Sequence, residues 1–194
     1  MLKELFLIFV AAVLVNNFVL TRFLGICPFL GVSGKVTTAW GMGMAVLFVM
    51  VIASVVTYCL YYFILIPFNI VYLRTISFIL VIASLVQIVE IILQKMSEKL
   101  YRALGIYLPL ITTNCAILGL VILAVDNNYS FITSVVFSCG AAFGFTIALI
   151  IMAGIREQLL LMDVPVTLQG TPIALIIAGL LSIAFLGFTG LVTF

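Results

Sequence analysis

The chain alternates between long apolar stretches and short polar segments that hold almost all of its charged residues. Because an α-helix needs about 20 apolar residues to cross the hydrocarbon core of a bilayer, these stretches predict how often the chain crosses it. They predict six membrane-spanning helices, at residues 5–34, 38–62, 70–94, 103–125, 129–155 and 171–193. The fold class is therefore expected to be an all-α integral membrane protein, with residues 1–194 in a single membrane domain.

The first of these helices is expected to be broken near residues 25–31. Gly25 and Gly31 loosen the backbone there, and Pro28 lacks the amide hydrogen that a helix interior needs. Proline is tolerated in the first turn of a helix. We therefore expect a second half-helix to begin at this point, with Cys27 at its N-terminus.

The fourth helix is expected to be broken as well. Pro109 precedes Thr112, Thr113 and Asn114, whose side chains can bond backbone groups that a break sets free. Irregular backbone at membrane depth is tolerated only where it is buried in protein or lines a cavity. Both breaks are therefore expected to face the interior of the protein and not the lipid.

The helix count predicts an internal symmetry. A group of three helices repeated in tandem enters the membrane in opposite directions, so residues of about 1–94 and about 103–194 are expected to form two inverted three-helix repeats. In such folds the functional groups lie near the bilayer midplane, where broken helices meet. The predicted breaks are in the first helix of each repeat.

Composition supports the membrane assignment, gives no indication of nucleic-acid binding and excludes roles that need histidine. The chain is 66% hydrophobic and 7% charged, with a mean hydropathy of +1.50, whereas soluble domains carry roughly 25% charged residues. A formal net charge of +2 does not indicate nucleic-acid binding. The absence of histidine removes the commonest metal ligand and the usual proton carrier near neutral pH.

The positions of lysine and arginine predict the orientation, because cytoplasmic loops are enriched in positive charge. If the N-terminus lies outside, Lys3 and Arg74 fall on the outer side. The inner segments then contain most of the eight positive residues, namely Arg22, Lys35, Lys95, Lys99, Arg102 and Arg156. Both termini are therefore predicted to lie outside.

Two look-alike motifs occur at the two predicted breaks. They are Gly25-Ile26-Cys27-Pro28-Phe29-Leu30-Gly31 and Thr113-Asn114-Cys115-Ala116-Ile117-Leu118-Gly119. Both contain the pattern Cys-x-x-Leu-Gly, and they are separated by somewhat less than half of the 194 residues. In an inverted repeat they would approach one shared point from opposite sides of the membrane.

Cys27 and Cys115 are therefore candidate metal ligands. The positive end of a helix favours the thiolate that binds metals. Two thiolates do not complete a site, since a 2Fe–2S cluster or a structural zinc ion needs four ligands. The missing pair would have to come from another chain. The alternative is that both cysteines are small inert residues at helix breaks, which is also the role expected for Cys59 and Cys139.

Glu90, Thr113 and Asn114 are candidates for an ion pathway. A carboxylate within a membrane helix is a functional candidate by default, but Glu90 comes shortly before Lys95 and an interfacial position is favoured. Thr113 and Asn114 offer oxygen atoms to a cation, although satisfying the broken backbone is the favoured role.

Two further features are interpreted as structural. The Gly41-Met42-Gly43-Met44 stretch is expected to allow close helix packing and not to form a methionine metal site. Arg156 and Glu157 are expected to form an ion pair in a loop, which contributes little if it is exposed.

Several segments together resemble the RnfA family of Rnf-complex membrane proteins, over essentially the whole chain. They are Val15-Asn16-Asn17-Phe18, Phe23-Leu24-Gly25-Ile26-Cys27-Pro28-Phe29, Leu108-Pro109-Leu110-Ile111-Thr112-Thr113-Asn114-Cys115-Ala116 and Ala153-Gly154-Ile155-Arg156-Glu157. That family is similar to a subunit of the sodium-pumping NADH:quinone reductase. The short link at residues 67–74 is closer to the Rnf branch, since the quinone-reductase relative carries a longer insertion there.

The resemblance implies a membrane subunit of an ion-translocating ferredoxin:NAD⁺ oxidoreductase in a bacterial or archaeal cytoplasmic membrane. It implies that Cys27 and Cys115 hold a 2Fe–2S cluster together with two cysteines of a homologous partner, RnfE. The other implied partners are RnfB, RnfC, RnfD and RnfG, which carry iron–sulfur clusters and flavins. The isolated chain would then have no activity of its own.

Two rival functions fit parts of the same pattern. Inverted repeats with broken helices are also the design of secondary transporters, and a purely structural membrane anchor needs only apolar helices. Only the electron-transfer function requires iron and sulfide at the cysteines. A transporter would move its substrate without redox input, and an anchor would tolerate the loss of both cysteines.

Overall fold

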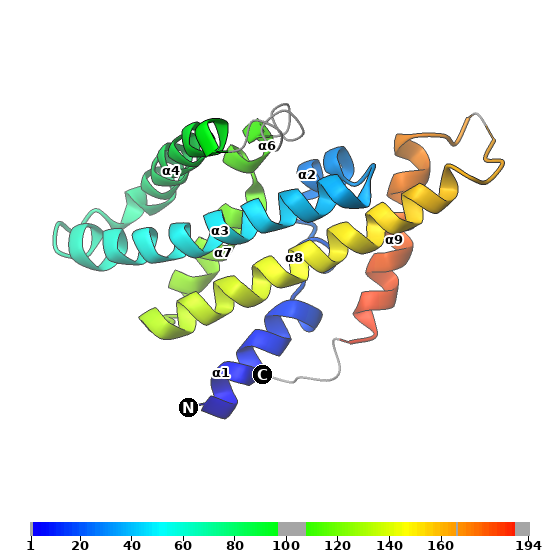
Figure 1. Ribbon diagram of the computed structural model, residues 1–194. Coiled ribbons are helices and arrows are strands. Elements are labelled where there is room, and N and C mark those ends of the chain that lie inside the picture. The colour runs from blue at the N-terminus through cyan, green and yellow to red at the C-terminus, as the bar shows by residue number, and fades with distance from the viewer. Residues whose placement is uncertain (1, 97–107, 166, 189–194) are drawn as a thin grey trace.

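A computed structural model of the chain describes residues 2–96, 108–165 and 167–188, and every regular element in these ranges is helical (Figure 1). In chain order the elements are α1 (Leu2–Val10), η1 (Ala11–Val15), α2 (Ile26–Val32), α3 (Val36–Leu60), η2 (Tyr61–Leu65), η3 (Val71–Leu73), α4 (Arg74–Met96), α6 (Leu108–Thr112), α7 (Cys115–Asp126), α8 (Phe131–Leu159) and α9 (Thr171–Leu186). The all-α prediction is confirmed for these residues.

Helices α3 and α8 lie side by side through the middle of the molecule and make its most extensive helix–helix contact (Figure 1). The buried positions of α3 recur every three or four residues, which is the spacing of one helix face. Met42 and Gly43 belong to that face, and a side chain at Gly43 would collide with Thr146 of α8. The interpretation of residues 41–44 as a close packing segment is thus confirmed for these two positions.

Where α8 crosses the first helix, two glycines of α8 lie directly against the backbone of that helix. A Cβ atom at Gly140 would lie 2.9 Å from the carbonyl oxygen of Phe9, and one at Gly144 would lie 2.8 Å from that of Val13. Small residues four apart on one helix let two backbones approach in this way. This pair is not among the sequence predictions, although its spacing is a known packing signal.

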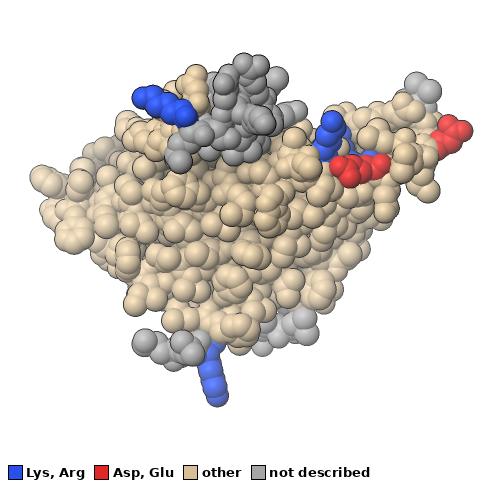
Figure 2. All heavy atoms as spheres, in the orientation of Figure 1, with Lys and Arg blue, Asp and Glu red and all other residues tan. Residues whose placement is uncertain are grey.

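Four described helices are long and apolar enough to cross a membrane, at Val36–Leu65, Val71–Ile92, Pro109–Asp126 and Phe131–Leu159. The helix at Thr171–Leu186 is apolar but shorter, and the first predicted helix is split into α1–η1 and α2. Figure 2 shows charged side chains at two opposite ends of the visible face, with a broad uncharged belt between them. The chain is therefore a multi-pass membrane protein.

The predicted helix boundaries need two corrections. The first break lies at residues 16–25 and not at 25–31, so Gly31 falls within α2. The physical reason is the Asn17 side chain, which bonds backbone amides just beyond the end of η1 and so favours a turn there. The polar stretch at 97–102, the predicted start of the fourth helix and the predicted end of the sixth lie outside the described residues.

The second correction concerns Arg156 and Glu157, which lie in the last turn of α8 and not in a loop. The Arg156 guanidinium donates to the carbonyl oxygen of Leu30 at 2.8 Å and to the Ser33 hydroxyl at 2.9 Å. The Glu157 carboxylate accepts from the amide of Val36 at 2.9 Å. Each side chain therefore satisfies a free helix end, of α2 and α3 respectively, instead of forming the expected loop ion pair.

We expect Gly144→Ala to destabilise the protein by about 1–3 kcal/mol, because the added methyl group would overpack against the fixed backbone of Val13. Gly154→Ala is the matched control on the same helix, since no atom lies within 4 Å of a Cβ built at that position. The measurement is the midpoint temperature of unfolding of the purified protein in detergent. Equal midpoints for the two variants would contradict the close crossing.

Candidate functional site

The first helix break is held in place by Asn17, which is fully buried. Its side-chain amide donates to the carbonyl oxygen of Gly144 on α8 at 2.8 Å, and its side-chain oxygen accepts from the amides of Val19 at 3.1 Å and Leu20 at 3.3 Å. Backbone groups that a broken helix frees at membrane depth need such partners, because lipid offers none. One asparagine therefore fastens the break to the central helix pair.

The chain leaves this break through Gly25, which precedes α2 with a φ of 81°. This left-handed conformation carries little steric cost for glycine, which has no Cβ. Cys27 and Pro28 then lie in the first turn of α2, where the missing amide hydrogen of proline is not required. The predicted placement of Cys27 at the start of a half-helix is thus confirmed.

The second break separates α6 from α7 at Thr113 and Asn114. Asn114 caps α7, with its side-chain oxygen accepting from the amide of Ala116 at 3.0 Å, and the Thr113 hydroxyl donates to the carbonyl oxygen of Pro109 at 3.1 Å. Both side chains therefore satisfy backbone groups. The side-chain nitrogen of Asn114 is buried and has no hydrogen-bond partner among the described residues.

The two breaks meet in space. The backbone amide of Gly25 donates to the Cys115 sulfur at 2.9 Å, across a sequence separation of 90 residues. A Cβ at Gly25 would lie 3.1 Å from the side-chain oxygen of Asn114, and one at Gly119 would lie 2.7 Å from a methyl carbon of Leu24. Leu24 and Gly25, just before the first Cys-x-x-Leu-Gly segment, therefore pack closely against the second motif, and glycines at positions 25 and 119 leave the space for this contact.

The expectation that both breaks face the interior is confirmed for the buried Asn17 and Asn114 but is wrong for the two cysteines, which lie at the surface because each begins a new half-helix there. Cys27 and Cys115 are both exposed, one in the first turn of α2 and the other as the first residue of α7. Cys59 is exposed as well and Cys139 is half-buried, but both lie within the helices α3 and α8 and not at a helix start. Within the described parts of the chain, no group of three or more Cys, Asp or Glu side chains is placed to hold a metal ion. This surface therefore offers two thiols, and a metal ion bound there would need further ligands from another chain.

Glu90 is half-buried on α4, which packs against both α6 and α7 and so flanks the second break. It belongs to neither break. Of the three candidate ion-pathway residues, the structure thus places Thr113 and Asn114 beside the exposed cysteines and Glu90 on a neighbouring helix.

The fold and the site together define a multi-pass helical membrane protein in which two broken helices bring two cysteines to one surface. The chain belongs to the family described as Rnf-Nqr subunit, membrane protein, whose model matches residues 5–192.

Similar proteins cover almost the whole chain. The A subunit of an ion-translocating oxidoreductase complex from Syntrophotalea carbinolica is 62% identical, over 98% of this chain and 99% of its own length. The A subunit of the Na(+)-translocating ferredoxin:NAD(+) oxidoreductase complex of Acetobacterium woodii is 58% identical, over 96% of this chain and 97% of its own. The A subunit of an ion-translocating oxidoreductase complex from Aeromonas hydrophila is 54% identical, over 98% of this chain and 99% of its own length.

We expect Gly25→Ala to destabilise the protein by about 1–3 kcal/mol, because alanine is strained at a φ of 81° and its methyl group would press on Phe145. Alkylation of Cys115 by a maleimide should also become faster as its contact with Gly25 is lost. Gly179→Ala, where nothing lies within 4 Å of the added carbon, is the control. If unfolding temperature and alkylation rate both stay at the wild-type values, the close packing of Gly25 against the second motif is refuted.

Proposed function

We propose that the chain is a membrane subunit of an ion-translocating ferredoxin:NAD⁺ oxidoreductase complex, and that Cys27 and Cys115 hold one half of a 2Fe–2S cluster. The observation that carries this proposal is the hydrogen bond between the Gly25 amide and the Cys115 sulfur, which joins the two cysteine motifs. The names of the relatives, each the A subunit of an ion-translocating or Na(+)-translocating oxidoreductase complex, support the assignment to such a complex.

The residues present fit one half of such a cluster. Cluster iron is held by cysteine thiolates, usually four. Two exposed cysteines supply two of them, and the amide of Gly25 supplies a hydrogen bond of the kind that tunes cluster potential. The N-terminal end of α7 adds partial positive charge beside Cys115, which is its first residue. The remaining two thiolates would come from a homologous membrane partner, which we identify with RnfE.

We propose further that the chain consists of two inverted three-helix repeats, which complete six spans. The pattern of contacts between whole helices supports this, because the same neighbours recur when the repeats are exchanged. The half-helix α2 packs on α8 as its counterpart α7 packs on α3, and α4 packs on α3 as α9 packs on α8. Helices α3 and α8 are the second helices of the two repeats, so exchanging the repeats leaves the α3–α8 contact unchanged.

This arrangement accounts for electron transfer across the membrane. When bound, the cluster accepts and releases one electron at a time, within a hydrocarbon core of about 30 Å. The protein supplies the position: Asn17 and Asn114 fix the two breaks, and Gly25 holds the Cys115 sulfur. RnfB, RnfC, RnfD and RnfG would carry the donors and acceptors on either side, so the isolated chain would be inactive.

Two other functions share part of this geometry. A secondary transporter also uses broken helices in inverted repeats, and Thr113, Asn114 and Glu90 offer oxygen ligands for an ion. A structural anchor requires none of these groups. The exposed pair of sulfur atoms favours electron transfer over both, because neither alternative needs thiols at the junction of the breaks.

The cysteine assignment is tested by Cys27→Ser and Cys115→Ser in the purified complex. Each variant should lose about two iron and two sulfide per complex, together with the matching signal in electron paramagnetic resonance, because the cluster loses one of its four ligands. Ferredoxin:NAD⁺ electron flow should cease while the subunits still assemble. Cys59→Ser and Cys139→Ser are the controls. They should retain the iron and sulfide, the paramagnetic resonance signal and the electron flow. Full iron and sulfide in either test variant excludes the shared cluster.

The orientation, with both termini outside the cytoplasmic membrane, is tested by single cysteines placed in a variant that lacks the four native ones. The Lys35→Cys or Asp163→Cys variant should react with a membrane-impermeant maleimide only from the cytoplasmic side. The Asn128→Cys variant should react only from the outer side. Labelling of Lys35→Cys and Asn128→Cys from the same side would contradict the inverted topology.

A further inference from the structure

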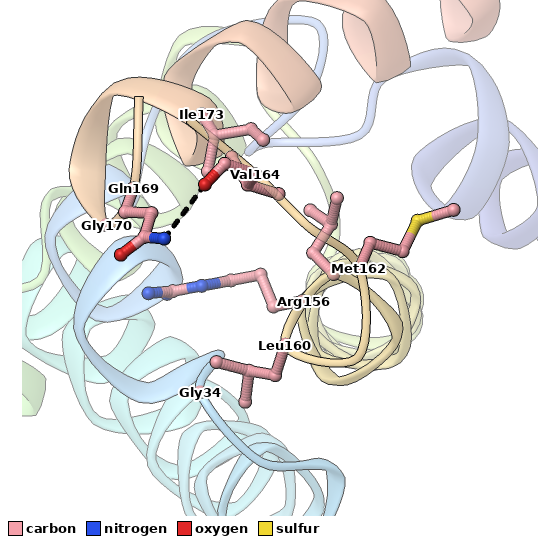
Figure 3. Close-up of a pocket in the computed structure, with 9 residues that line it drawn as sticks. Gly34, Arg156, Leu160, Met162, Val164, Gln169, Gly170 and Ile173 are labelled. Carbon is pink, nitrogen blue, oxygen red and sulfur yellow. Dashed lines mark hydrogen bonds between the residues drawn. The ribbon is translucent and has the colours of Figure 1, made fainter. Parts of the chain in front are cut away.

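A cavity of about 670 Å³ lies where α8 ends, on the side of the molecule at which α2 gives way to α3 (Figure 3). Its walls come from the α2–α3 turn, the last turn of α8, the following loop and the start of α9. The residues that line it are Gly34, Arg156, Leu159, Leu160, Met162, Val164, Gln169, Gly170 and Ile173. None of them takes part in the proposed electron transfer.

Arg156 is the one ionisable residue in this lining. One nitrogen of its guanidinium donates to Leu30 and Ser33, which orients the group. Figure 3 shows the side chain extending from α8 across the cavity. A guanidinium has five N–H donors, so most of them stay available for a ligand. The amide of Gln169 is already engaged, since it donates to the carbonyl oxygen of Val164 at 2.9 Å.

Most of the other side chains that line the cavity are apolar, and two of them are strongly exposed. Leu160 is 80% exposed and Met162 is 68% exposed, and both line the cavity with Ile173. Two apolar spans have one end beside the cavity. These are the N-terminal end of Val36–Leu65 and the C-terminal end of Phe131–Leu159. The cavity therefore lies at the depth where lipid headgroups meet their acyl chains, and its composition matches both parts.

We propose that this cavity binds a membrane phospholipid, with the lipid phosphate on Arg156 and an acyl chain along Leu160, Met162 and Ile173. Arginine matches phosphate in charge and in geometry, because its planar fork donates two parallel hydrogen bonds. Basic pockets between membrane helices bind lipid headgroups in this way. A soluble anion would leave the exposed leucine and methionine without an apolar partner, which favours a lipid over free phosphate.

The test is photolabelling of the intact purified complex with a phosphatidylglycerol that carries a diazirine in its acyl chain. Peptides from residues 159–173 should be labelled, and mass spectrometry measures the extent. Leu160→Glu should reduce labelling about tenfold, because a carboxylate at the wall repels both the phosphate and the chain. Leu161→Glu is the matched control and should label like the wild type, because Leu161 is 89% exposed but does not line the cavity.

The role of the cation is tested separately. Arg156→Gln should also reduce labelling about tenfold, the loss expected for a charge-assisted hydrogen bond. Arg156→Lys should restore only part of it, because lysine keeps the positive charge but lacks the planar fork. Ser33→Ala removes one structural partner of the guanidinium and leaves its charge in the cavity, so labelling should persist. This variant separates lipid binding from the cap that Arg156 provides for α2.

Three results would overturn the proposal. Equal labelling of Leu160→Glu and Leu161→Glu would show that the cavity wall does not select the lipid. Equal labelling by a diazirine diacylglycerol, or complete block by sodium phosphate alone, would show that headgroup and chain are not recognised together. Absence of labelling in the wild-type complex would show that another protein of the complex occupies the cavity.

Discussion

The need of a broken backbone for hydrogen-bond partners inside a bilayer is the constraint on which the rest of this structure depends. Lipid cannot bond free amide and carbonyl groups, so each break must find partners within the protein. Asn17 supplies them at the first break and Asn114 at the second. Because the Asn17 side chain also binds Gly144, the first break is fastened to α8, which positions everything that follows it.

The same breaks place two cysteines at the starts of helices. Each break ends by starting a new half-helix, and Cys27 and Cys115 lie in the first turns of those half-helices. Close packing at Gly25 and Gly119 keeps these starts together, while the regular parts of α3 and α8 fill the core behind them. The proposed cluster would take ligands from a second chain, so its cysteines must be exposed before assembly, and Cys27 and Cys115 are both exposed.

Charged residues act mainly at the helix ends. Arg156 and Glu157 each bind a terminus of a neighbouring helix, and Arg74 pairs with Asp126 at 2.7 Å between α4 and α7. A charged side chain is costly within the hydrocarbon but inexpensive at its boundary. These four charged residues thus act where helices end, and Arg156 also faces the cavity beside α9.

The length and composition of the apolar stretches determined the class of protein and most helix positions, because burial in lipid depends on these two properties. Proline, glycine and the repeated Cys-x-x-Leu-Gly pattern determined that the first and fourth helices break and that Cys27 starts a half-helix. The true limits of the first break required the long-range bond from Asn17 to Gly144, which no local pattern contains. Likewise, only the tertiary structure decided that Gly25 contacts Cys115 and that Arg156 and Glu157 bind separate helix ends. These contacts join residues far apart in the chain. They stabilise the protein only once α2, α3, α7 and α8 are packed together.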